Sequence, residues 1–240
     1  HFFNDSIGGA ALIGGRIVST RDRGENWQIS YLGDYDYRDI QFTGRDTAYA
    51  VGTGGAVIKS VNGGRRFSLV STLNGVKLLS LCFRDNNTGW VCGSGGEIFR
   101  TDDGGKSWTQ QADGNGIALN AICLAGSGRV YAAGWYGTIM YTEDGGATWK
   151  EDSTPVSGHL NTVFFPDSAH GWAAGVDGII LHRKGQGEWQ VQESGTGEWL
   201  NDIFFIDSET GWAVGTEGVL LKTTDGGTTI EKKNPAETAG

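Results

Sequence analysis

The sequence predicts an all-β fold, a six-bladed β-propeller of four-stranded blades with a repeated turn motif. Glycine supplies 41 of the 240 residues and proline only 3. This composition suits many tight turns and disfavours long helices, because a glycine inside a helix costs about 1 kcal/mol relative to alanine. Glycines and aromatic residues also recur every 40 or 41 positions, and each interval contains short alternating apolar stretches bounded by turn residues.

Two sets of residues define the repeat. The glycines are Gly52, Gly93, Gly134, Gly175 and Gly215, and the aromatic residues are Tyr49, Trp90, Tyr131, Trp172 and Trp212. Because both sets have one period, we expect six units of about 40 residues within a single propeller domain over 1–230, followed by a polar tail over 231–240. Four-stranded units with this period are typical of β-propellers. The regularity of the aromatic set indicates core positions.

The last unit shows the predicted strands most clearly. Strands are expected at 200–206, at 211–215, at 218–223 and from about 228 onward, with turn residues between them. In the first unit, Phe2-Phe3 aligns with Phe204-Phe205, so the start of its first strand is expected to be missing. A removed leader or a lost seventh blade stays open at this point.

The turn before each fourth strand carries a motif. Residues 101–108 and 142–149 fit S/T-x-D-x-G-x-T/S-W, the Asp-box or bacterial neuraminidase repeat, with weaker copies at 20–27, 60–67, 183–189 and 223–230. We interpret the aspartate as an acceptor for turn amides, the glycine as a positive-φ residue and the tryptophan as packing between blades. Trp27, Trp108, Trp149 and Trp189 are therefore expected to be buried. Calcium binding would require six to eight oxygens, and no distal glutamate closes the loop, so no metal is expected.

Charge and cysteine content restrict the partners. With 19 Lys and Arg against 28 Asp and Glu, the formal charge is −9, which disfavours nucleic acid and anionic membranes. No apolar run approaches the roughly 20 residues of a membrane span, so membrane insertion is not expected. Cys82, Cys92 and Cys123 are odd in number and lack C-x-x-C spacing, which argues against a disulfide framework and a zinc site. Cys82 and Cys123 occupy equivalent positions in successive units, further apart than the roughly 7 Å that a disulfide tolerates, so three free thiols are predicted.

Residues that break the repeat are candidates for binding, because the repeated residues serve the blades. The predicted surface, on the face of the central channel, comprises Tyr35, Tyr37, Arg38, Trp135, Tyr136, His159 and Trp199. Aromatic residues with a polar group are frequent at protein interfaces and also stack on sugars. The alternative is that these rings only cover loop backbone.

The equivalent first-strand residues Arg38, Leu79, Asn120, Asn161 and Asn201 could line the channel. Nearby, Asp39 and Asp202 could form a carboxylate pair for glycoside hydrolysis, which would require them to lie about 5–10 Å apart.

The complete units, such as 200–227, resemble the photosystem II stability/assembly factor family of Asp-box propellers. The resemblance implies a non-enzymatic binding or assembly propeller that engages a protein partner through its channel face. It also implies an extracytoplasmic location, periplasmic or secreted, and we expect a monomer without a cofactor. The alternatives are a carbohydrate-binding propeller and a sialidase-like or xyloglucanase-like glycoside hydrolase. The short, uniform loops disfavour the enzyme.

Overall fold

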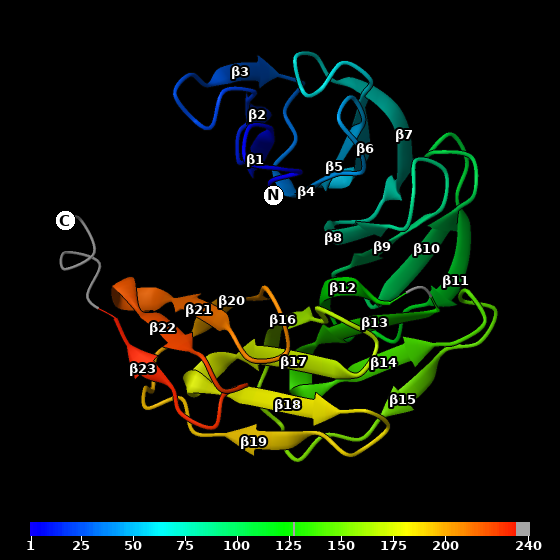
Figure 1. Cartoon of the computed structure of the whole chain (residues 1–240). Coiled ribbons are helices and arrows are strands. Elements are labelled where there is room, and N and C mark those ends of the chain that lie inside the picture. Colours follow the sequence, from blue (N-terminus) through cyan, green and yellow to red (C-terminus); the bar gives the residue numbers. More distant parts are fainter. Residues whose placement is uncertain (127, 234–240) are drawn as a thin grey trace. The chain divides into compact units, whose positions relative to one another are not determined.

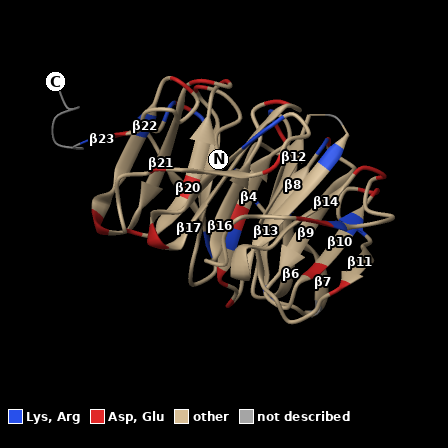
Figure 2. Ribbon diagram, turned by 90° about the horizontal axis from the view of Figure 1, so that it is seen from below, with Lys and Arg blue, Asp and Glu red and all other residues tan. Residues whose placement is uncertain are grey.

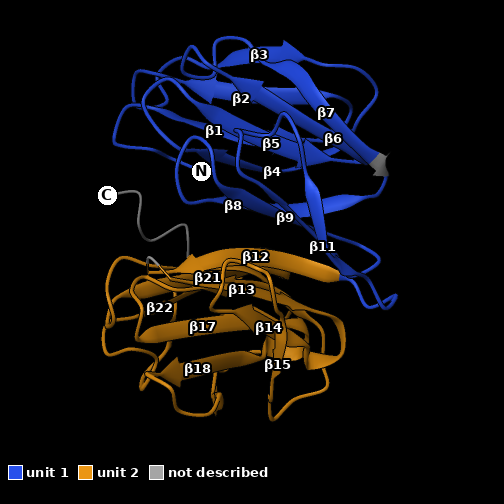
Figure 3. Cartoon of the chain, turned by 90° about the vertical axis from the view of Figure 1, so that its right-hand side faces the viewer, with its two compact units in different colours: residues 1–118 blue, residues 119–240 orange. Residues whose placement is uncertain are grey.

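In the computed structural model, six antiparallel sheets follow one another along the chain (Figure 1). The structure describes residues 1–126 and 128–233. The chain forms two compact units, His1–Ala118 and Leu119–Gly240, and each contains three of the sheets (Figure 3). The sheets are the predicted blades, and the predicted all-β, six-bladed class is confirmed.

The first unit contains one three-stranded blade and two four-stranded blades. Its strands are β1 (Gly8–Leu12), β2 (Arg16–Thr20), β3 (Gln28–Tyr31), β4 (Tyr37–Phe42), β5 (Ala48–Gly52), β6 (Gly54–Ser60), β7 (Ser68–Gly75), β8 (Leu78–Phe83), β9 (Gly89–Gly93), β10 (Glu97–Thr101) and β11 (Thr109–Asp113). In the first blade, Phe2 forms an isolated bridge to Gly8. Phe2 thus lies beside β1 in the place of a first strand, as the alignment of Phe2-Phe3 with Phe204-Phe205 predicts.

The second unit contains three four-stranded blades. Its strands are β12 (Leu119–Ala125), β13 (Arg129–Gly134), β14 (Ile139–Thr142), β15 (Lys150–Asp152), β16 (Leu160–Phe164), β17 (His170–Gly175), β18 (Ile180–Lys184), β19 (Gln190–Gln192), β20 (Leu200–Phe205), β21 (Gly211–Gly215), β22 (Leu220–Thr223) and β23 (Glu231–Lys232). Three 3₁₀ turns follow the second strands, namely η1 (Trp135–Gly137), η2 (Val176–Gly178) and η3 (Thr216–Gly218). Turn η3 delays the start of β22 relative to the predicted 218. β23 takes up the first two residues of the expected tail, and residues 234–240 lie outside the described chain.

The repeated aromatic residues form the contacts between consecutive blades. Tyr49 stacks on Phe83 of the next blade with ring centroids 3.9 Å apart, and Trp172 stacks on Phe205 at 3.7 Å. Such pairs add about 0.5–1.5 kcal/mol to the burial of their area. Tyr49, Trp90, Tyr131 and Trp172 are at most 1% exposed, which confirms their predicted core role. Trp212 is half-buried.

The Asp-box tryptophans depart from the expected burial. Trp189 is 3% exposed, Trp108 and Trp149 are half-buried, and Trp27 is 44% exposed. The predicted burial is therefore confirmed for Trp189 and wrong for Trp27, Trp108 and Trp149. Three of the rings lie edge-on to a phenylalanine of their own blade: Trp108 contacts Phe83, Trp189 contacts Phe165 and Trp27 contacts Phe2. Trp108 and Trp189 also pack with core residues of the preceding blade, as predicted. Trp27 is the most exposed of the four, and its neighbour Phe2 lies in an isolated bridge and not in a full strand.

The Asp-box turns are held together by their own aspartates. In the third copy, the backbone amide of Ser107 donates to Asp103 Oδ1 at 2.9 Å, and its hydroxyl donates to Oδ2 at 2.6 Å. The amide of Gly105, with φ 83°, donates to the Thr101 hydroxyl at 2.9 Å. These bonds to the carboxylate lower the pKa of Asp103 to about 2. The structural interpretation of the motif is confirmed.

The fifth copy of the motif obtains its carboxylate from the preceding blade. Here buried Arg183 replaces the threonine, and its guanidinium forms an ion pair with Asp152 at the end of β15. The indole of Trp189 donates to the same carboxylate, with Nε1 3.0 Å from Oδ2. Asp152 therefore connects two blades and compensates for the acid that this copy lacks.

First strands carry a bulge at one repeated position, which corresponds to Arg38, Leu79, Asn120, Asn161 and Asn201. At two of these positions the side chain connects neighbouring blades. Asn120 Nδ2 donates to the carbonyl oxygen of Leu160 at 2.8 Å, and Asn161 Nδ2 donates to that of Leu200 at 2.9 Å. These amides, expected at a channel lining, form hydrogen bonds between blades.

All three cysteines are free, as predicted: Cys82 and Cys92 are buried, and Cys123 is half-buried. Burial raises the pKa of the Cys123 thiol well above its ordinary value. Within residues 1–126 and 128–233, no helix is long and apolar enough to cross a bilayer.

Candidate binding surface

The loops that follow the second strands of the second unit share an unusual backbone conformation. The middle residues of η1, η2 and η3 are Tyr136, Asp177 and Glu217, with φ of 58°, 54° and 52°. Asparagine, aspartate and glycine tolerate this left-handed region best, and a bulky residue there carries strain. Gly137 follows with φ 69°, and a Cβ on it would lie 2.1 Å from the carbonyl oxygen of Val156. The turn thus requires glycine at its third position, and it holds an aromatic residue in an uncommon conformation at its second.

Three of the predicted binding residues form one cluster, which we call the aromatic cluster: Trp135, Tyr136 and His159. The rings of Trp135 and His159 stack with centroids 5.0 Å apart and planes 19° apart. Tyr136 lies edge-on to His159 at 5.2 Å and edge-on to Trp135 at 6.2 Å. Trp135 is 41% exposed and Tyr136 61% exposed. The cluster is therefore a preformed patch with aromatic surface open to solvent.

A hydrogen bond fixes the imidazole in this cluster. The backbone amide of Tyr136 donates to His159 Nδ1 at 3.1 Å. Nδ1 is therefore an acceptor, and in the neutral ring the proton sits on Nε2, which can donate to a ligand. His159 comes from the connection that precedes β16, so two consecutive blades build the cluster.

Trp199 occupies the position equivalent to His159 in the next blade and is 54% exposed. Its backbone amide donates to the Thr216 hydroxyl oxygen at 3.1 Å. The Thr216 hydroxyl donates to Glu198 Oε2 at 2.7 Å. This blade therefore presents an exposed indole beside a carboxylate that is fixed by a hydrogen bond.

The other three predicted residues lie in the first unit and form no comparable cluster. Tyr37 is 2% exposed, its hydroxyl donates to the carbonyl oxygen of Leu32 at 2.9 Å, and burial raises its pKa to about 12. Its prediction as a surface residue was wrong, because it fills a core position of β4. Tyr35 is half-buried and covers Gly33 and Gly54. Arg38 is exposed and lies 3.8 Å from the carboxylate of Asp36.

The two aspartates considered for hydrolysis are engaged in contacts between blades. Asp39 Oδ2 accepts hydrogen bonds from the Ser80 hydroxyl at 2.8 Å and from the backbone amide of Leu81 at 2.9 Å. Desolvation raises the pKa of Asp39 despite these bonds. Asp202 accepts from the Thr162 hydroxyl at 2.9 Å. The two carboxylates belong to different units, and each has a structural role in its own unit.

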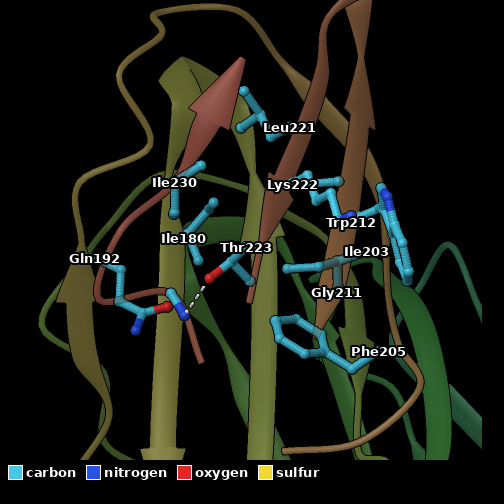
Figure 4. A pocket seen from close by; sticks show the side chains of 12 residues that line it. Ile180, Gln192, Ile203, Phe205, Gly211, Trp212, Leu221, Lys222, Thr223 and Ile230 are labelled. Atoms are coloured by element: carbon cyan, nitrogen blue, oxygen red, sulfur yellow. Dashed lines mark hydrogen bonds between the residues drawn. The ribbon is translucent and has the colours of Figure 1, made fainter. Parts of the chain in front are cut away.

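An apolar pocket lies where the last two blades of the second unit meet (Figure 4). Its wall includes Ile180, Ile203 and Phe205, and its end is formed by an Asp-box turn, in which the Gly227 amide donates to Thr223 Oγ1 at 2.8 Å. Among the described residues that line it, Lys222 alone is ionisable. The pocket therefore reflects core packing and has no candidate catalytic group. Among the residues that the structure describes, no three His, Cys, Asp or Glu side chains are grouped to hold a metal ion.

Sequence reasoning missed the uneven distribution of charge between the units. The first unit has 12 Lys and Arg against 12 Asp and Glu, and the second has 7 against 16. The formal charge of −9 is thus carried entirely by residues 119–240. Acidic segments lie at the ends of β17 and β21, where η2 and η3 begin (Figure 2). Counting the charges in each half of the sequence is the signal that could have revealed this asymmetry.

Repeated antiparallel sheets and Asp-box turns define an Asp-box β-propeller, and an exposed aromatic cluster lies beside its second-strand loops. The family model described as Photosynthesis system II assembly factor YCF48 matches three stretches of the chain, residues 67–126, 112–184 and 181–239. The chain belongs to this family. No curated protein matches the sequence.

Solved structures show the same fold at low identity. A structure described as YCF48 bound to D1 peptide is 20% identical with a TM-score of 0.81, and the match covers 99% of this chain and 82% of that one. YCF48 from Cyanidioschyzon merolae is 19% identical with a TM-score of 0.79, over 98% and 84% of the two chains. A GH74 xyloglucanase from Xanthomonas campestris is 16% identical with a TM-score of 0.76, over 97% of this chain but 44% of that one.

Proposed function

We propose that this protein is a non-enzymatic assembly-type propeller that engages a protein partner through the face bearing the aromatic cluster. The observation that carries the proposal is an exposed tryptophan–tyrosine pair at a turn where the other blades place Gly, Asp or Glu. The turn does not need these rings for its conformation, since a tyrosine fits the left-handed region poorly. Exposed Trp and Tyr are the residues most enriched at interface hot spots.

Family membership supports the same function. The matched family is one of assembly factors, and one relative of the same fold has been solved with a peptide bound. A preformed patch binds with a small ordering cost, because Trp135 is already stacked and His159 is already hydrogen-bonded. The face is the one predicted from the repeat pattern, without Tyr37.

Site-specific photo-crosslinking in the source organism tests the proposal. A benzophenone amino acid would replace Tyr136 or, as the control, Glu209, which is exposed at the opposite end of β21 from η3. We expect a discrete protein adduct from position 136 and none from position 209. The same adduct from both positions, or none from position 136, would refute engagement through this face.

A carbohydrate is the second candidate ligand, because the exposed indole of Trp135 could stack on a sugar ring. Titration with xyloglucan oligosaccharides distinguishes the two functions. Saturable binding that disappears in Trp135→Ala, together with no protein adduct, would favour the carbohydrate. The extracytoplasmic location stays a prediction, which cell fractionation would check.

A further inference from the structure

The aromatic cluster leaves ring surface free for a ligand, and the geometry restricts the kind of ligand. One face of Trp135 is covered by His159, whereas Tyr136 meets Trp135 at an interplanar angle of 86°. Two rings at right angles form a corner with a ring face beside a ring edge. The face of an indole or phenol attracts a cation, and the attraction is stronger where the cation is desolvated.

The loops around this corner carry only one sign of charge. Five segments form this face in the second unit: residues 134–138, 153–159, 175–179, 193–199 and 215–219. They contain Asp177, Glu193, Glu198 and Glu217 and no Lys or Arg. Asp177 and Glu217 are exposed, at turn positions equivalent to Tyr136. Consecutive blades thus present an aromatic corner and then two carboxylates at the same structural position.

The basic residues of the unit lie elsewhere or are already paired. Arg129 and Lys150 both contact Glu143, which belongs to an Asp-box turn at the other end of the strands. Arg183 is buried against Asp152, and Lys233 pairs with Glu231. The excess negative charge of the second unit therefore meets no compensating cation within these five segments.

We propose that the partner segment recognised by this face is a cationic peptide whose Arg or Lys side chains contact the Trp135–Tyr136 corner and the carboxylates of Asp177 and Glu217. This inference rests on the proposed function and specifies the chemistry of the partner. Charge complementarity selects the segment and accelerates its encounter. The aromatic corner supplies the contact that salt screens least, because a cation over a ring is partly desolvated.

Fluorescence anisotropy with three labelled twelve-residue peptides tests this inference. The peptides share a Gly/Ser framework and carry Arg, Gln or Glu at the same four positions. We expect the Arg peptide to bind about tenfold or more tightly than the Gln peptide and the Glu peptide not to bind. Raising the salt concentration from 20 to 200 mM should weaken the Arg peptide several-fold, as expected for exposed charges.

Two double variants locate the contact. Trp135→Ala/Tyr136→Asn removes the corner while placing a residue that tolerates positive φ in the turn, and Asp177→Asn/Glu217→Gln removes the two charges. Each should lower the affinity for the Arg peptide by about five- to tenfold. The matched control, Glu188→Gln/Glu209→Gln, removes two exposed charges outside this face and should change the affinity less than twofold. Unchanged melting temperatures would confirm that all variants are folded.

Three results would overturn the inference. Equal weakening by the control and by Asp177→Asn/Glu217→Gln would show that net charge alone attracts the peptide. Equal binding of the Arg and Gln peptides would show that charge is not recognised, and a crosslink from position 136 would then leave the proposed function standing. Absence of both peptide binding and crosslink would refute the two together.

Discussion

The asparagines at the first-strand bulges should stabilise the contacts between blades. Asn120→Ala and Asn161→Ala each remove an amide that donates to a backbone carbonyl of the next blade, at 2.8 and 2.9 Å. Both acceptor carbonyls belong to leucines that are 0% exposed, so water does not replace the lost donor freely. A buried acceptor without its hydrogen bond costs about 1–3 kcal/mol.

We therefore expect each variant to lose about 1–2 kcal/mol of unfolding free energy, which corresponds to a decrease of roughly 3–6 °C in melting temperature for a chain of this size. Urea denaturation followed by tryptophan fluorescence measures the free energy, and calorimetry measures the melting temperature. The slope of the urea transition should stay unchanged, because the exposed surface on unfolding is the same.

Asn201→Ala is the matched control for this prediction. Asn201 occupies the same bulge in the last blade, but it is exposed, and within residues 1–126 and 128–233 its side chain forms no hydrogen bond. Its removal should cost less than about 0.5 kcal/mol. If Asn201→Ala were as destabilising as Asn161→Ala, the bulge backbone and not the hydrogen bond between blades would be the cause, and the reasoning would fail.

Three further predictions concern the core, the turns and the thiols. Trp189→Ala should cost about 3–5 kcal/mol and the equivalent Trp27→Ala about 1 kcal/mol, and equal losses in urea denaturation would contradict the burial difference. Asp103 has a folded pKa of about 2, below the ordinary 3.8. Its contribution to stability is therefore present above about pH 4 and is lost as the pH falls toward 2. In unfolding experiments from pH 2 to 6, Asp103→Asn should flatten this decrease in stability. Without reductant, the denatured protein should take up three thiol-specific labels. The native protein should react slowly at Cys123, because its raised pKa disfavours the thiolate. Mass spectrometry counts the labels, and fewer than three in the denatured protein would indicate a disulfide.

The repeat made the blade architecture predictable, because a residue that recurs every 40 or 41 positions must have the same environment in each blade. Trp90 and Trp172 could therefore be assigned to the core from their spacing alone. The same reasoning failed for Trp27, since burial depends on a neighbouring strand as well as on the residue. In that blade the neighbouring residue Phe2 forms an isolated bridge in place of a full first strand.

The site was predicted from residues that break the repeat. Such a break shows that the blade does not need one particular residue at that position, but it does not show whether the side chain is exposed to solvent. This reasoning found Trp135, Tyr136 and His159. It could not show that they touch, because the Tyr136 amide and the His159 imidazole that it bonds lie 23 positions apart in the sequence. It wrongly included Tyr37, which is also irregular within the repeat but faces the core. The carboxylates at Asp177 and Glu217 were overlooked because acidic turn residues are common on any acidic chain.

The contacts between consecutive blades determine how far a destabilising substitution acts along the chain. Asn120, Asn161 and Asp39 reach a partner 39 to 42 positions further along the chain, and the stacked aromatic residues reach one 33 or 34 positions further. Within each unit, stability is then approximately a sum of terms for single blades and for adjacent pairs, as in a one-dimensional array. A substitution in the middle blade of a unit weakens the contacts with two neighbouring blades of that unit, whereas the same substitution in its last blade weakens the contacts with one. Equivalent substitutions should therefore rank by the place of the blade in its unit, with the blade of β16–β19 the most sensitive in the second unit.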